Sequence, residues 1–429
     1  MAAGYTLGMP ASEPAPAHSA AAVAAAGRAG KAGGAGFGTQ VLLMLAIFGF
    51  ATCVTMLGPL LVDLSRDLDV SLGQAGLLAA AMAVTWALAA PFAGVLSDRF
   101  GRRPLIVMAL LGLGAVTLGA GLASSFGVLL VMRTLAGVFG GFGPAVVIAA
   151  AGDLFPPARR GMAMGWANLG FSMAALVGVP SIGAIGGTLG WRWAFVATGL
   201  MVIAVGVLIR LTFPSPRLRH DGHAATDDAT TYREAFRVPG LWSILLANVF
   251  ERALFNLAVL YLPSFLMLSY GLDAVAVAPI LVLMAIGSIV GTLGGGWLGD
   301  RLSKATIFVV AQAAAASIAL VLFTQAPGLA ISAAGGALFT LVNASSRPAL
   351  LALSTELSTR YRGAILGVFS VTNQAGIVLG SSAGGLAIGL GGYGALAVTM
   401  AVDGMLASGL ALPLLRRRPA ARPDATLAS

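Results

Sequence analysis

The chain has 429 residues, of which 58% are hydrophobic and only 10% are charged, and its mean hydropathy is +0.92. So few polar side chains could not cover a water-soluble globule, and most of the chain is expected to lie in lipid. A single cysteine excludes a disulfide framework, and the three histidines lie outside the apolar stretches, which excludes a histidine proton relay in the membrane.

The first 38 residues are rich in Ala, Gly and Pro, carry few charges and show no helical periodicity. They lack the charged segment and cleavage site of a signal peptide. Residues 1–38 are therefore predicted to form a disordered cytoplasmic tail. Residues 416–429, which begin with three arginines, are predicted to form a second tail.

Twelve apolar runs follow the first tail, each close to the ~20 residues that an α-helix needs to cross the hydrocarbon core. They fall at 39–62, 74–95, 104–123, 127–150, 162–187, 193–213, 241–266, 275–297, 305–324, 328–352, 364–387 and 393–415. The expected fold class is an all-α integral membrane protein with twelve transmembrane helices. Most of the chain is then expected to be in contact with the lipid bilayer.

The positive charges gather on one side of these spans. Of the 25 Lys and Arg residues, only Arg66 and Arg192 fall in loops of the opposite side, and Arg133, Arg252 and Arg347 fall inside apolar runs. The positive-inside rule therefore places both termini in the cytoplasm. The net charge of +9 is then a sign of membrane topology, and no nucleic-acid partner is expected.

The spans divide into two similar sets of six. The longest loop, 214–240, is a charged, proline-containing linker between them. Several residues recur 202 positions later: Gly94/Gly296, Asp98/Asp300, Arg99/Arg301, Arg102/Lys304, Arg160/Arg362, Gly161/Gly363, Gly165/Gly367 and Gly178/Gly380. We therefore expect two six-helix bundles, 39–213 and 241–415, related by a pseudo-two-fold axis along the membrane normal.

A short charged turn, GVLSDRFGRR at 94–103, follows the second span. Gly94 would allow close helix approach and Gly101 would allow a tight turn. Asp98 and Arg102 are four residues apart and can form an ion pair.

Candidate partners for these cations lie at the ends of other spans. Asp153, which ends the fourth span, could pair with Arg102, and Glu356 could pair with Lys304 in the second copy. The alternative is that the arginines of the turn serve only as topology signals.

These motifs resemble those of a known family. GVLSDRFGRR is similar to the signature loop between spans two and three of the major facilitator superfamily, and GGWLGDRLSK at 295–304 is similar to its copy between spans eight and nine. RTLAGVFGG, which begins at Arg133, resembles the span-four motif. Residues 170–195 resemble the span-five motif of proton-coupled exporters through Gly178, Pro180 and Gly183, although Val179 separates the first glycine from the proline.

The resemblance implies a secondary transporter of the 12-span drug:proton antiporter or sugar-efflux type, in the bacterial inner membrane. It implies that the charged pairs hold the two halves together on the cytoplasmic side when the pocket faces outward. A monomer without cofactor or metal is expected. No nucleotide-binding loop or HExxH motif is present, so an enzyme is not expected.

Five ionisable residues lie inside apolar runs: Arg133, Glu251, Arg252, Arg347 and Asp403. Each would cost ~2.5–3.5 kcal/mol at the bilayer centre, so each needs a partner or a task. The resemblance links Arg133 to proton transfer; packing against backbone carbonyls is the alternative. Asp403 lies in span twelve, which the resemblance implies is peripheral, and has no assigned role.

The resemblance also places spans seven, ten and eleven around a central cavity. The polar and aromatic residues expected to line it are Asn248, Arg252, Asn256, Asn343, Arg347, Asn373, Gln374 and Trp166. Glu251 is expected to carry the coupling proton. A static ion pair with Arg347 or Arg252, and contact with substrate, are the alternatives that stay open.

Three arginines against one central carboxylate favour an anionic or zwitterionic small-molecule substrate. The expected function is proton-coupled export of small organic compounds by alternating access. The alternative is a proton-symport importer of organic anions, and a membrane sensor that has lost transport is less favoured.

Overall fold

The computed structural model describes residues 36–213, 233–358 and 360–415. These residues are almost entirely helical and include no strand, which confirms the all-α expectation. Most of the two predicted tails and of the 214–240 linker lies outside the described residues.

Three of the six crossings predicted for the first half are broken, so each of these three consists of more than one helical segment. Its helices are α2 (Phe37–Thr55), α3 (Leu57–Asp67), α4 (Leu72–Phe100), α5 (Arg102–Gly121), α6 (Phe126–Gly141), α7 (Pro144–Leu154), α8 (Pro157–Met173), the π-helical turn η1 (Ala174–Gly178), α9 (Val179–Leu189) and α10 (Trp191–Thr212).

Each break has a local cause. Proline lacks a backbone N–H and interrupts the hydrogen-bond ladder of a helix, so kinks gather at prolines and at π-turns. Pro59 lies just after the break between α2 and α3, Pro144 begins α7, and Pro180 follows the π-turn η1.

The second half contains α12 (Leu241–Tyr270), α13 (Ala274–Gly299), α14 (Lys304–Gln325), α15 (Leu329–Glu356) and α16 (Arg362–Leu415). The 54 residues of α16 are not one straight helix, because Gly391 and Gly392 have non-helical backbone angles. Among the described residues eleven helices are long and apolar enough to cross a membrane, and the break divides α16 into two crossings. The total of twelve is therefore confirmed.

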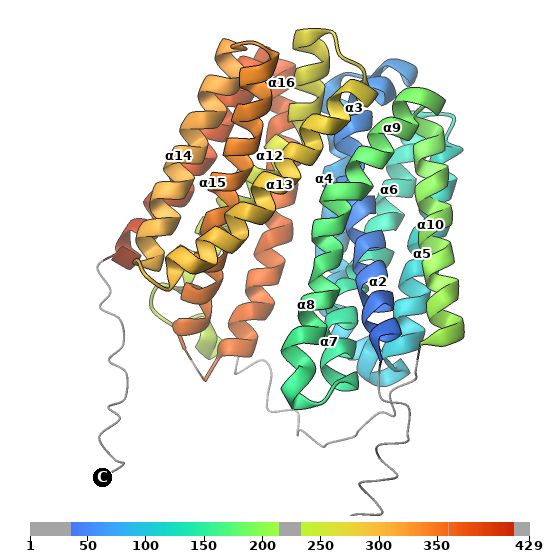
Figure 1. Ribbon diagram of the computed structural model, residues 1–429, viewed down its shortest axis with the longest axis vertical. Coiled ribbons are helices and arrows are strands. Elements are labelled where there is room, and N and C mark those ends of the chain that lie inside the picture. The colour runs from blue at the N-terminus through green and yellow to red at the C-terminus, as the bar shows by residue number, and fades with distance from the viewer. Residues whose placement is uncertain (1–35, 214–232, 359, 416–429) are drawn as a thin grey trace, which may run out of the picture.

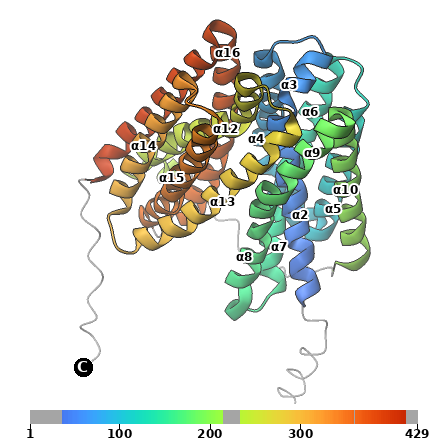
Figure 2. The ribbon, with the colours of Figure 1, turned by 45° about the horizontal axis from the view of Figure 1, so that its top comes forward.

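The two bundles lie side by side and meet at one end only (Figure 1). We call this the closed end; it carries the turns at Gly190, Gly271 and Gly392. The opposite end, the hairpin end, carries the turns at Gly101 and Ser303. Figure 2 shows the same separation of α2–α10 from α12–α16 after rotation.

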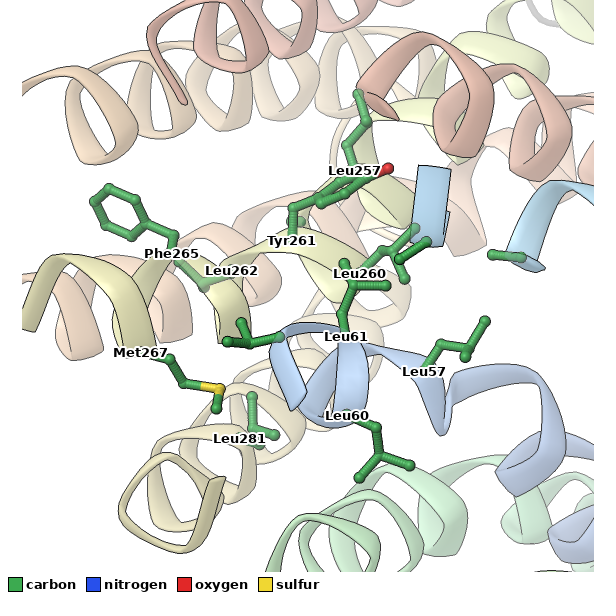
Figure 3. Packing of buried hydrophobic residues seen from close by; sticks show 14 of the residues in the cluster. Leu57, Leu60, Leu61, Leu257, Leu260, Tyr261, Leu262, Phe265, Met267 and Leu281 are labelled. Atoms are coloured by element: carbon green, nitrogen blue, oxygen red, sulfur yellow. The ribbon is translucent and has the colours of Figure 1, made fainter. Parts of the chain in front are cut away.

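The buried apolar side chains form three clusters that follow this division. One lies wholly in the first half and one wholly in the second. The third crosses between halves at the closed end and includes Leu57, Leu60 and Leu61 of α3 together with Leu260 and Leu262 of α12 (Figure 3). The hydrophobic contact that joins the bundles is therefore confined to the closed end.

Glycines allow backbones to touch across this joint. A Cβ added at Gly385 of α16 would lie 2.6 Å from the carbonyl oxygen of Gly73 on α4, and one at Gly58 would lie 2.6 Å from that of Val259. Real Cβ atoms do not approach so closely. The closed end is therefore sealed by helix contacts that tolerate no side chain.

An ionic contact ties two turns of the first half at the closed end. Arg192 pairs with Asp67, and the Trp191 indole Nε1 donates a hydrogen bond to the same carboxylate at 3.1 Å. The Arg192 guanidinium also lies over the Trp191 ring, 4.4 Å from its centroid. The hydrogen bond from Arg192 holds the pKa of Asp67 below its usual range.

Replacing Asp67 by asparagine is expected to lower stability slightly at neutral pH. A carboxyl with a depressed folded-state pKa stabilises the fold above its unfolded pKa of about 3.9, and this contribution is lost as pH falls through the folded value. Because both partners are solvent-exposed, we expect a loss of ~0.2–1 kcal/mol. Thermal unfolding of Asp67→Asn and wild type should differ near pH 7, and the difference should shrink as the pH falls below about 3.9 and through the folded-state pKa of Asp67.

Candidate functional site

Glu251 lies on α12 between two apolar clusters of that helix: the closed-end cluster begins at Leu254, and the second-half cluster ends at Ala247. Its side chain is 0% exposed. Arg252 Nε donates to Glu251 Oε2 at 2.6 Å, Arg252 Nη2 bonds to Oε1, and Arg347 Nη1 donates to Oε2 at 3.0 Å. Two arginines from two helices therefore hold one buried carboxylate.

Arg347 extends the cluster to a third helix. Its Nη2 donates to Asn373 Oδ1 on α16 at 3.2 Å. The Arg347 side chain is 33% exposed, whereas that of Arg252 is 13% exposed and lies over the Phe255 ring. The cluster thus joins α12, α15 and α16, and with Glu251 ionised it carries a net charge of +1.

Two predicted cavity residues donate hydrogen bonds to α16. Asn248 Nδ2 donates to Thr372 Oγ1 at 2.8 Å and to the Phe369 carbonyl, and Asn256 Nδ2 donates to Ser381 Oγ at 2.9 Å. They lie one turn on either side of Arg252 and fix α12 against α16. Their contacts are those of helix packing in lipid, where side-chain amides bond across helices.

Asn343, expected in the cavity, lies elsewhere. It is fully buried on α15 and donates to Gln312 Oε1 of α14 at 3.3 Å, while Gln312 Nε2 donates to Ser346 Oγ. Sequence reasoning missed Gln312, a polar residue inside the ninth span. Gln374 is half-buried on α16, next to Asn373, and makes none of the contacts of the Glu251 cluster.

Trp166 and Arg133 also lie apart from this cluster. Trp166 packs edge-on against Phe37 at the start of α2, with ring centroids 5.4 Å apart. Arg133 is buried in the first half, and its Nη1 donates to the Cys53 carbonyl at 3.0 Å. That contact is the backbone-carbonyl alternative considered above. Asp403 is buried on the last crossing, where its Oδ2 has no hydrogen-bond partner.

The charged turns form ion pairs within each half. Arg102 lies 3.1 Å from both Asp98 and Asp153, and Lys304 pairs with Glu356. In this structure, whose halves are apart at the hairpin end, neither of these pairs joins one half to the other.

The remaining residues of the turns show one expected and one unexpected feature. Gly101 has φ +94°, a backbone region that favours glycine, as a tight turn requires. Close helix approach at Gly94 is not seen, because a Cβ built there or at Gly296 meets no atom within 4 Å. Arg99 and Arg301 cover the rings of Phe100 and Trp297, and Asp300 ends α13.

The two glycines of the span-five motif make different contacts, one within the first half and one with the second half. A Cβ at Gly178 would lie 2.7 Å from Thr52 Oγ1, within the first half. A Cβ at Gly183 would lie 3.2 Å from the Ala274 carbonyl oxygen, across the joint between halves. Pro180 lies in the first turn of α9 between them. Gly183 is therefore one of the glycines that allow close contact between the two halves at the closed end.

Comparison with known proteins agrees with this architecture. The family model described as Major Facilitator Superfamily matches residues 43–380. The inner membrane transport protein YdhP of Escherichia coli K12 is 30% identical over 393 residues, which cover 88% of this chain and 96% of that protein. This chain belongs to the major facilitator superfamily. Its members are transporters, not enzymes.

Other relatives in the superfamily are named for different substrates. A chloramphenicol resistance protein of Streptomyces lividans is 29% identical, covering 61% of this chain and 66% of that protein. A probable nitrate/nitrite transporter, NarK2, of Mycobacterium tuberculosis is 29% identical, covering 65% and 70%. Among solved structures, a bacterial homologue of the lysosomal transporter Spinster, inward-facing and unoccupied, matches with TM-score 0.71 at 20% identity, covering 88% of this chain and 94% of that one.

Proposed function

We propose that this protein is a proton-coupled secondary active transporter of small organic compounds, working by alternating access as a monomer in the bacterial inner membrane. The observation that supports it best is the fully buried Glu251 carboxylate, held by arginines from two helices. A proton carrier must exchange its charge between two environments, and a carboxylate paired across helices is poised to do so when those helices move.

Alternating access is supported by the way in which the halves meet. They contact each other through the closed-end cluster and lie apart at the hairpin end. If the positive-inside rule holds, both termini and the hairpin end face the cytoplasm, and this conformer is inward-facing. In the opposite conformer the Arg102 and Lys304 turns would come together. We propose that their ion pairs then hold the two halves together on the cytoplasmic side.

Two directions of transport have support. Export is supported by the span-five glycines and by the similarity to a chloramphenicol resistance protein. Import of organic anions by proton symport is supported by the surplus of one positive charge in the Glu251 cluster and by the similarity to a probable nitrate/nitrite transporter. A static role for the ion pair is less favoured, because a third of the Arg347 side chain is exposed.

Transport in membrane vesicles of both orientations tests the proposal. With an imposed pH gradient, an exporter should accumulate its substrate in inverted vesicles that are acidic inside. A symporter should instead accumulate it in right-side-out vesicles placed in an acidic medium. Solute flux that ignores the pH gradient in both orientations, for a compound that the purified protein demonstrably binds, would overturn proton coupling.

A further inference from the structure

We propose that Arg347 is the receptor for an anionic group of the substrate, and that Glu251 occupies this receptor until it takes up a proton. Proton and anion would then bind together and cross the membrane together. This inference rests on the proposed function and adds to it a substrate class, small organic carboxylates or sulfonates, and a sign for the coupling.

The two arginines are held unequally by Glu251. Arg252 is the next residue on the same helix and binds both carboxylate oxygens. Arg347 comes from α15, makes one bond to Glu251 through Nη1, and makes its other bond through Nη2 to the neutral side chain of Asn373. Arg347 is also the more exposed of the two. It can therefore exchange Glu251 for another oxyanion while Arg252 keeps its bidentate contact.

A guanidinium suits such an exchange. Its N–H groups form a planar fork that matches the two oxygens of a carboxylate, and a sulfonate presents oxygens with the same spacing. Asn373 stays neutral at every pH and can donate to the incoming oxyanion through its amide nitrogen. In the resting structure, Glu251 thus occupies the place of the substrate's anionic group.

The charges fix the sign of the coupling. The charged groups that face Glu251 among the described residues are Arg252 on α12 and Arg347 on α15, while α16 contributes the neutral Asn373, which binds Arg347. The site therefore carries +1 with Glu251 ionised and +2 with Glu251 protonated. A cation is repelled in both states, and an anion binds more strongly in the second, because its competitor has lost its charge.

Linkage makes this effect reciprocal. If protonation of Glu251 strengthens anion binding by some factor, bound anion strengthens proton binding by the same factor, typically about 5–150-fold. A carrier with positive coupling carries both ligands in one direction. The inference therefore favours symport over antiport, and with an inward proton gradient it favours uptake of the anion.

The test uses formate, which has the same head group as Glu251 and is small enough to fill the space that its removal leaves. In Glu251→Ala the two arginines lose their counter-charge. Formate at constant ionic strength should raise the thermal unfolding temperature of purified Glu251→Ala, and methylammonium should not. Should Glu251→Ala fail to fold, the near-isosteric Glu251→Gln is measured in its place.

Two further variants test whether stabilisation by formate depends on Arg347. Arg347→Gln in the same background should abolish stabilisation by formate, whereas Arg66→Gln, which removes an exposed arginine of α3, should leave it unchanged. In the wild type, formate should bind more tightly as the pH is lowered from 7.5 to 5, by no more than the coupling factor of about 5–150-fold, and Glu251→Gln should bind it equally at both pH values.

Absence of a formate response in both Glu251 variants, or a response that survives Arg347→Gln, would overturn the inference. Binding of formate by the wild type with no dependence on pH would also contradict it. None of these outcomes would contradict the proposed function. Failure of that function would appear as solute flux that does not depend on the pH gradient. The two ideas therefore fail in different measurements.

Discussion

Glu251→Gln is expected to abolish proton-driven accumulation of substrate and to spare exchange of substrate across the membrane. Glutamine keeps the shape and an oxygen acceptor for the arginines but cannot release a proton. A carrier that moves one proton with each substrate can concentrate it about tenfold for each unit of pH difference. The variant should lose this gain and bring substrate only to equal concentrations on both sides.

Liposomes with the purified protein separate the two activities. Uptake against a gradient is measured with an imposed pH difference, and counterflow of labelled substrate is measured without one. Retained counterflow shows that the variant is folded, which matters because leaving a buried charge unpaired can cost ~3–5 kcal/mol. Glu234→Gln, at an exposed ion pair with Arg360, is the matched control and should keep proton-driven uptake.

If Glu251→Gln transported with an unchanged pH dependence, Glu251 would be a static counter-ion for Arg252 and Arg347. The coupling carboxyl would then have to be sought elsewhere. Asp403 would be the next candidate, because it is buried in the last crossing and one of its carboxylate oxygens has no partner in the structure.

The sequence predicted the Glu251 cluster for a physical reason. Charged residues are so costly in lipid that the few present must find one another or perform a task, and Glu251, Arg252 and Arg347 do meet. It could not place Asn343, since the apolar runs are hydrophobic on every side and hide which face of a helix turns inward. That face is set by packing, which turned Asn343 toward Gln312.

The number of crossings was predictable for a similar reason, while their breaks were not. Twenty apolar residues satisfy the bilayer whether the helix is straight or kinked, so composition alone does not show the breaks at Met56 and Phe142. The bend at Gly391 falls between two predicted spans and agrees with the expected boundary.

The closed-end seal was not foreseen from the sequence at all. Gly73 and Gly385 belong to different halves, and nothing local in either stretch indicates that their backbones touch. The 202-residue repeat does not help, because it relates equivalent positions of the two copies and not positions that contact each other. Such contacts follow from how the two bundles dock, which is a property of the assembled halves.

Gly385→Ala is therefore expected to force the closed end apart. The added methyl group would meet the Gly73 carbonyl oxygen at 2.6 Å, and overpacking of this kind costs ~1–3 kcal/mol. Because that cost applies only while the closed end is shut, the population should shift about 5- to 150-fold toward the conformer that is open there. Gly389→Ala, one turn further along the same helix, is the control, since its Cβ would meet no atom within 4 Å.

Distances between spin labels measure the shift directly. Labels at Leu122 and Leu390, which are 72% and 79% exposed, report on the closed end, and labels at Phe100 and Leu302 report on the hairpin end. Cys53 is buried and should not react with the label. Gly385→Ala should lengthen the first distance and shorten the second, while Gly389→Ala, with the same gain in helix propensity of ~1 kcal/mol, should change neither. Because rocking halves must open one end as they shut the other, both distances lengthening together would show that the substitution had loosened the protein without switching it.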